Sequence, residues 1–164
     1  MQPLTSANVQ AALDQLELDL KIRFFEDSTA TSQMAADNIG CELGQIVKSL
    51  AFIVDGQPIL VLTSGDQRVD DRKIAALFGV GRKKVKIAKP EQCVEIYGYE
   101  PGGVPPLGHR AADLKTFIDE SLKRYEQIYA AGGARNAIFG LTLAQLEQIS
   151  GGTFADVVQD AGDR

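Results

Sequence analysis

The chain has 164 residues and a formal net charge of −5 at pH 7, with 45% hydrophobic and 24% charged residues. A chain of this length can bury one sizeable core, so we predict a single domain over residues 1–164. No run of about 18 apolar residues and no basic-then-apolar amino terminus occurs, so neither a membrane span nor a signal peptide is indicated. We therefore expect a cytoplasmic protein without a membrane partner. Cys41 and Cys93 lack CxxC spacing, which argues against a disulfide framework and a zinc site.

Helical and extended patterns alternate along the first half of the chain. Val9, Leu13 and Leu16 recur at helical spacing, and a turn at 55–57 between two apolar, β-branched runs is typical of a hairpin. In chain order we predict a helix from Thr5 or Ser6, a strand at 21–25, a helix from Thr31-Ser32 to Gly40, and strands at 46–54 and 58–63.

The second half continues this alternation, without an internal repeat or a linker. We predict a helix at 69–78 ending at Gly79, a strand at 85–87, a short helix from Pro90 to near Gly98, strands at 114–118, 127–130 and 137–141, and a helix from Thr142 to Ile149. The sequence thus predicts an α+β fold, a single compact domain with a mixed β-sheet or partly closed barrel surrounded by helices.

The negative net charge hides a basic segment between Arg68 and Lys89. Eight basic residues there face two acidic ones, a local charge of +6, which leaves −11 for the rest of the chain. Such a segment can meet a phosphate-rich ligand while the acidic remainder repels nucleic acid elsewhere. The alternative is a solvated helix and turn whose lysines serve solubility.

Residues 102–109, with the sequence GGVPPLGH, combine unusual backbone freedom with unusual constraint. Glycines let backbone N–H groups approach a ligand closely, while prolines fix φ and remove donors. This pattern predicts a binding loop, and the alternative is an ordinary tight connection between two elements.

Lys48 is unusual because it lies within an apolar strand. Strict alternation places it on the same side as Ile46, Leu50, Phe52 and Val54. Burying an ammonium group without a partner is costly. Either the stem lies on the core while the head reaches solvent, or the head enters a cleft and meets an anion.

Several catalytic classes lack their motif. His109 is the only histidine, no serine lies in a GxSxG elbow, and neither a P-loop nor a GxGxxG after a strand occurs. What remains is a lysine, an amide-rich loop and one imidazole. This set suits the orientation of a substrate and a water more than covalent attack.

Five sequence blocks span nearly the whole chain: 45–52 (QIVKSLAF), Gly65-Asp66 with Val69-Asp70, 102–109, 118–122 (IDESL) and 131–133 (AGG). In this order they resemble the YbaK/ProX family of aminoacyl-tRNA deacylases, which includes the editing domain inserted in many bacterial prolyl-tRNA synthetases.

The resemblance implies a free-standing editing enzyme that hydrolyses the ester of a mischarged tRNA, without a metal or another cofactor. The typical substrate would be a tRNA for proline carrying alanine, cysteine, serine or threonine, bound by its acceptor end. Lys48 would hold the 3′-terminal nucleotide or its phosphate, backbone groups of Gly102 and Gly103 would position the aminoacyl group and the water, and the ribose hydroxyl of the substrate would take part in catalysis. A transient association with an aminoacyl-tRNA synthetase is compatible with this function.

A wider set of candidates surrounds these residues. The substrate-binding candidates are Thr31, Val104, Pro105, Pro106, Gly108, His109, Asp119, Gly132 and Gly133, and the tRNA-binding candidates are Arg82, Lys83 and Lys84. Each also has a structural explanation: a helix cap for Thr31, a turn for the histidine, the carboxylate and the glycines.

Two other functions stay open at this point. One is a non-catalytic module that binds tRNA or an aminoacyl-nucleotide. The other is a hydrolase or regulator that acts on a different aminoacyl or small nucleotide ligand, for which the basic segment would be incidental.

Overall fold

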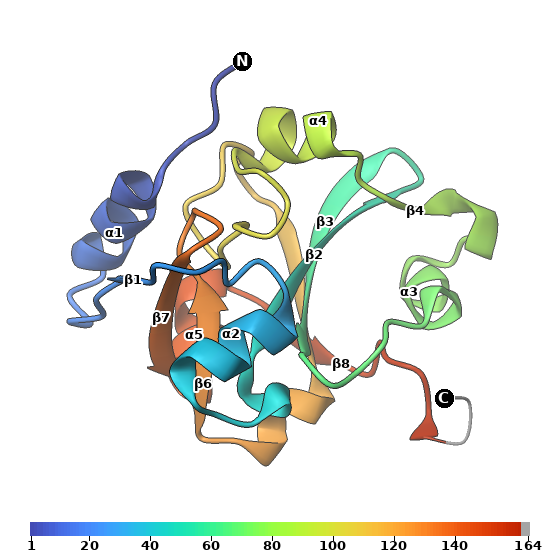
Figure 1. The fold of residues 1–164 in the computed structure, drawn as a ribbon. Coiled ribbons are helices and arrows are strands. Elements are labelled where there is room, and N and C mark those ends of the chain that lie inside the picture. Colours follow the sequence, from blue (N-terminus) through green and yellow to red (C-terminus); the bar gives the residue numbers. More distant parts are fainter. Residues whose placement is uncertain (162–164) are drawn as a thin grey trace.

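The computed structural model describes residues 1–161, whose strands form two sheets (Figure 1). The larger sheet has the order β4-β2-β3-β5-β8 and contains β2 (Val47–Val54), β3 (Gln57–Ser64), β4 (Val85–Ile87), β5 (Lys115–Asp119) and β8 (Thr153–Ala155). The smaller sheet has the order β1-β7-β6 and contains β1 (Arg23–Phe24), β6 (Gln127–Ala131) and β7 (Ala137–Thr142). The predicted α+β fold is confirmed, and the described strands form no closed barrel.

The described α-helices are α1 (Ser6–Gln15), α2 (Ser32–Ile39), α3 (Asp71–Phe78), α4 (Pro90–Gln92) and α5 (Leu143–Ser150). A π-helical turn, η3 (Cys93–Tyr97), continues α4, and 3-10 turns form η1 (Leu43–Gln45), η2 (Arg82–Lys84) and η4 (Glu120–Arg124). In Figure 1, α1 lies on the side of the smaller sheet and α3 on the side of the larger one.

Most predicted helix ends and strands are confirmed, and the differences have local causes. The helix predicted from residue 69 begins at Asp71, because the side chain of Asp70 accepts a hydrogen bond from the Arg72 amide at 3.0 Å and so caps it. Val69 instead pairs with Val158. The strand predicted over 21–25 is only the two residues of β1, and no sequence pattern predicted β8 or the turns η1, η2 and η4.

The larger sheet is buried on both faces. On one face Val47 and Ala51 of β2 join the largest apolar cluster, and on the other Phe52 packs with Ile74 of α3. Ile46 precedes β2, forms an isolated bridge with Tyr129 of the smaller sheet and belongs to a third cluster under α2. Strict alternation predicted that Lys48 lies on the same side as both Ile46 and Phe52. In the structure Lys48 and Phe52 share one side of β2, whereas Ile46 precedes the strand and packs in a different apolar cluster.

Candidate functional site

A pocket of about 560 Å³ lies along the edge of β2 that faces away from β3. β4 pairs with β2 only over residues 52–54, and the bridge to β6 is at Ile46, so within the described residues Lys48–Leu50 has no strand partner on this edge. The pocket lining comes from α2 and the loop before it, from β2, from the segment between β4 and η3, and from the ends of β6 and β7. The loop after η3 contributes Pro101, Gly102 and Val104, whereas the candidate Gly103 lines a second hollow instead. Segments distant in sequence thus meet at one open strand edge.

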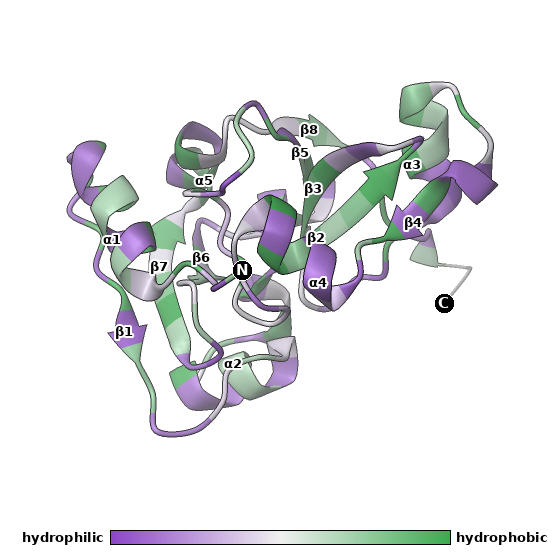
Figure 2. Cartoon of the chain, turned by 90° about the horizontal axis from the view of Figure 1, so that it is seen from above, coloured by the Kyte–Doolittle hydropathy of each residue, from purple (hydrophilic) through white to green (hydrophobic). Residues whose placement is uncertain are grey.

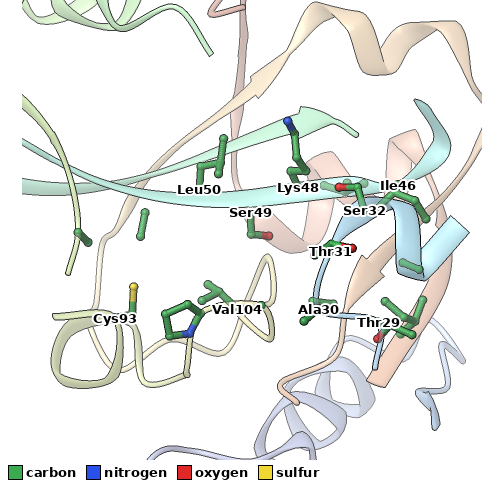
Figure 3. A pocket seen from close by; sticks show the side chains of 18 of the residues that line it. Thr29, Ala30, Thr31, Ser32, Ile46, Lys48, Ser49, Leu50, Cys93 and Val104 are labelled. Carbon is green, nitrogen blue, oxygen red and sulfur yellow. The ribbon is translucent and has the colours of Figure 1, made fainter. Parts of the chain in front are cut away.

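Lys48 and Ser49 lie on opposite sides of β2. Figure 3 shows Ser49 directed towards Val104 and Thr31, while Lys48 points the other way. The Oγ atom of Ser49 is buried and has no hydrogen-bond partner within the described residues. A buried hydroxyl without a partner is unfavourable, so a polar group of a ligand would stabilise it.

The ammonium group of Lys48 is at the rim of the pocket, where it donates a hydrogen bond to the carbonyl oxygen of Gln67. Burial lowers the pKa of Lys48, and the nearby carboxylate of Asp66 opposes this effect. An ammonium group carries three donors. Lys48 is therefore held in place by one carbonyl while it keeps donors for an anionic ligand.

The carboxylate beside Lys48 is fixed by an arginine. Arg124 of η4 binds Asp66 through two nitrogens, at 3.0 and 2.7 Å, and donates to the Ser64 hydroxyl at 2.7 Å. The hydrogen bonds from Arg124 lower the pKa of Asp66 to about 2, so the carboxylate is ionised at neutral pH. The Gly65-Asp66 block therefore supports the rim electrostatically.

The pocket side of the predicted binding loop is a tight turn. The Gly103 amide donates to the Glu100 carbonyl at 3.1 Å, and Gly102 has a φ of 90°, as in a type II turn with Pro101 before the glycine. A Cβ atom on Gly102 would lie 2.9 Å from the Cβ of Ala30, so glycine is required for conformation and for space.

Two pocket-lining residues of this loop have backbone amides without an acceptor in the described part of the chain. The N–H groups of Gly102 and Val104 donate to no protein group within residues 1–161, and both residues line the pocket. Val104 is only 4% exposed. Since a buried N–H without a partner costs free energy, these amides are suited to bind an oxygen of a ligand.

The far side of the loop is held by aromatic side chains. The Nε2 atom of His109 lies 2.6 Å from the Pro105 carbonyl oxygen, and the Tyr99 hydroxyl donates to the Gly108 carbonyl at 2.7 Å. Burial lowers the pKa of His109 and favours the neutral ring, which donates through Nε2–H. Within residues 1–161, none of Pro105, Pro106, Gly108 and His109 lines the pocket, and the contacts of Pro105, Gly108 and His109 hold the loop together.

The remaining substrate-binding candidates are divided. Thr31 lines the pocket, and its hydroxyl also caps α2 by accepting from the Met34 amide at 3.1 Å. Gly133 donates to the Gly103 carbonyl at 3.0 Å and borders a second hollow of about 430 Å³ beside the start of α1. A Cβ atom on Gly132 would lie 3.0 Å from the Ile22 side chain, so that glycine permits close packing.

Asp119 is not brought to the pocket. Its side chain is 1% exposed, and its two oxygens accept hydrogen bonds from the Ser121 and Val157 amides, each at 2.9 Å. The carboxylate therefore caps the start of η4 and links it by a hydrogen bond to the carboxyl-terminal segment at Val157.

The basic candidates lie on the exposed turn η2, directly before β4. Arg82 pairs with Asp71 at 3.0 Å and Lys84 with Asp55 at 3.8 Å, whereas Lys83 forms no ion pair in the described part of the chain. β4 ends at Ile87, which lines the pocket, so η2 leads towards the pocket mouth.

Several lining residues were missed from the sequence. Ser49 could have been found from alternation, since the residue after Lys48 must face the other side of β2. Ala30, Ala131 and Ile138 carry no chemical signal, and only the fold brings them to the pocket. Among residues 1–161 no group of His, Cys, Asp and Glu side chains could hold a metal ion, and no helix is long and apolar enough to cross a membrane.

Comparisons with known proteins agree with the resemblance seen in the sequence blocks. The family described as the aminoacyl-tRNA editing domain matches residues 26–149. YwhH, an uncharacterized protein of Bacillus subtilis (strain 168), is 36% identical over 144 residues, which cover 87% of this chain and 89% of YwhH. The crystal structure of a candidate trans-editing enzyme for prolyl tRNA synthetase has a TM-score of 0.87 and 37% identity, covering 94% of this chain and 97% of that chain.

A synthetase is also similar over part of its length. The proline–tRNA ligase of Lactobacillus gasseri is 39% identical over 79 residues, which are 48% of this chain and 14% of the ligase. The match to the family model covers more than half of the chain, and the YwhH match covers most of both proteins. The chain therefore belongs to the aminoacyl-tRNA editing domain family, of the YbaK/ProX type.

Proposed function

We propose that this chain is a trans-editing deacylase, which hydrolyses the ester between a tRNA and a small non-cognate amino acid. The substrate class is tRNA for proline carrying alanine, cysteine, serine or threonine. The observation that carries the proposal is a pocket that combines two free backbone amides, a lysine at the rim and a wall of small side chains. Ala30, Ala35 and Ala131 form part of this wall, and the pocket volume of about 560 Å³ is in the range of small-molecule sites.

The two free amides define the proposed reaction centre. The ester carbonyl oxygen accepts hydrogen bonds from the Gly102 and Val104 amides, which stabilise negative charge on that oxygen when water attacks the carbonyl carbon. The bond from this carbon to the ribose oxygen then breaks, and that oxygen takes a proton. The products are the free amino acid and the uncharged tRNA. The attacking group in this proposal is water; burial raises the pKa of the nearby Cys93 thiol, which disfavours its reactive thiolate form.

The cations act on the nucleic acid. Lys48 binds the 3′-terminal nucleotide or its phosphate at the rim, and Arg82, Lys83 and Lys84 contact phosphates of the acceptor stem. Such contacts supply sequence-independent affinity that falls with salt concentration. The substrate is a tRNA released by an aminoacyl-tRNA synthetase, with which the chain associates transiently.

The test is single-turnover hydrolysis of proline tRNAs charged with alanine, cysteine, serine, threonine or proline. The unmodified chain is compared with Lys48→Ala and with Lys21→Ala, a control in an exposed lysine that pairs with Asp14 outside the pocket. We expect cleavage of one or a few mischarged species, reduced by a factor of about 10–100 in Lys48→Ala alone, as for the loss of one hydrogen bond to a charged group. No cleavage of any species, with tRNA binding intact, would favour a non-catalytic binding module.

A further inference from the structure

Ile87, at the end of β4, is exposed to an unusual degree for its type. Its exposed fraction is 75%, which among the large hydrophobic side chains of residues 1–161 is exceeded only by Met1. The residue nevertheless lines the mouth of the pocket. A single exposed isoleucine is unremarkable elsewhere on a surface, but at the mouth of a pocket it offers apolar area to a ligand.

The position of Ile87 in the sheet places other apolar side chains beside it. Ile87 pairs directly with Phe52 in the antiparallel β2–β4 ladder, so their side chains lie on the same side of the sheet. Leu50 and Lys48 are two and four residues before Phe52 and therefore lie on this side as well. Figure 3 shows Leu50 and Lys48 directed to the same side of β2. Along one rim of the pocket, the order is thus isoleucine, leucine, lysine.

Positive charge lies next to this rim, with Lys86 on the opposite face of β4 to Ile87. Lys86 and Lys89 are exposed, lie within two residues of Ile87 and form no ion pair within the described chain. Figure 2 shows hydrophilic segments at β4 and the turn before it, next to the hydrophobic strands β2 and β3. An apolar side chain flanked by unpaired cations suits a ligand with an apolar face and neighbouring phosphates.

We infer that Ile87 and Leu50 form a platform for the terminal base of a single-stranded RNA acceptor end, with Lys86 and Lys89 beside its phosphates. This inference rests on the proposed function, because it places the nucleotide that carries the aminoacyl group. The base packs its flat face on the platform, Lys48 lies at the other end of the rim, and the aminoacyl group passes over the free edge of β2 towards Ser49 and Val104.

The test uses a probe that is bound but not cleaved, the trinucleotide CCA carrying alanine through a 3′-amide. A second probe has the same amide but no adenine on its terminal ribose. Dissociation constants are measured by fluorescence anisotropy for the unmodified chain, Ile87→Ser and Leu77→Ser. Leu77 is the matched control, since it is 47% exposed on α3 and lines neither hollow.

We expect Ile87→Ser to weaken binding of the complete probe about tenfold and to leave the probe without adenine within about twofold, because only the first loses apolar contact. Lys86→Ala and Lys89→Ala should each reduce the salt slope by about 0.7, the value for one phosphate contact of a single strand. An equal effect of Ile87→Ser on both probes, or none on the complete probe, would overturn the platform.

Measurements on the same variants distinguish the platform from other occupants of the rim and from the proposed function. If Ile87→Ser dissociates a dimer in sedimentation experiments without weakening the probe, the rim is a contact between copies and the platform is wrong. Since the probe is not cleaved, its binding does not depend on hydrolysis. If the tRNA ester stays intact while Ile87→Ser still weakens binding of the complete probe, the deacylase proposal is wrong and the platform stands.

Discussion

The two walls of the pocket differ in how their polar groups are used. In the loop 100–109 the backbone is held by its own turn, by His109 on the Pro105 carbonyl and by Tyr99 on the Gly108 carbonyl. Across the pocket, at the edge formed by β2 and β4, the Ser49 hydroxyl has no hydrogen-bond partner and Lys86 no ion pair within residues 1–161, and Ile87 is 75% exposed. A fixed wall can place two amides accurately for chemistry, while an open edge can adapt to a nucleic acid.

The largest expected effect comes from Gly102→Ala in the fixed wall. Both this variant and the control Gly56→Ala have a positive φ, 90° and 81°, but a Cβ atom meets Ala30 at 2.9 Å only at position 102. The conformation costs about 1–2 kcal/mol at either site, and the close contact adds about 1–3 kcal/mol at Gly102. Urea unfolding measures the free energy of unfolding of the two variants, and single-turnover experiments measure their rate of ester cleavage. Equal stability of the two variants with unchanged cleavage would contradict a tightly held loop.

The next effect concerns the pH dependence of the fixed wall. Burial lowers the pKa of His109 below its usual 6.5, so the unfolded chain binds more protons than the folded chain once the pH falls below that value. The free energy of unfolding should decrease between pH 7 and pH 5, by at most about 1.4 kcal/mol per pH unit. In His109→Gln this decrease should be absent, since His109 is the only histidine. Parallel curves for both proteins would show that the imidazole is not held in its neutral form.

A smaller effect separates capping from binding at Thr31. Thr31 and Thr142 each cap a helix by accepting an amide hydrogen bond at 3.1 Å, but only Thr31 lines the pocket. Replacement of either by alanine should lower the free energy of unfolding by about 1 kcal/mol. Thr31→Ala alone should also change the cleavage rate at saturating substrate. If the Thr142→Ala variant changes it as much, the effect of Thr31 is only structural.

The smallest effect is expected at the open edge. Lys83 forms no ion pair within residues 1–161, whereas Arg82 pairs with Asp71 at 3.0 Å. Lys83→Ala should weaken tRNA binding about threefold and reduce the salt slope by about one, while Arg82→Ala should have a weaker effect because its charge is already partly neutralised. Binding is measured over a series of salt concentrations. A larger effect of Arg82→Ala than of Lys83→Ala would contradict this ranking and place the phosphates along Arg82.

The sequence predicted the fold better than the pocket. Periodicity and caps located α1, α2 and the β2–β3 hairpin, because these features are local. The pocket depends on long-range contacts, such as that between Gly102 and Ala30, which no local pattern reveals. Asp119 shows the limit clearly. A carboxylate in a recognisable block suggested substrate binding, but two backbone amides occupy its oxygens inside the core.

The most direct test of the account is to observe where an aminoacyl end binds. The 15N-labelled chain would be titrated with CCA carrying 3′-amide-linked alanine, and amide chemical shifts would be recorded. We expect the largest changes at Gly102 and Val104 and at Ala30, Ser49 and Ile87. Changes centred instead on the second hollow, at residues 3–7 and 133–135, would contradict it.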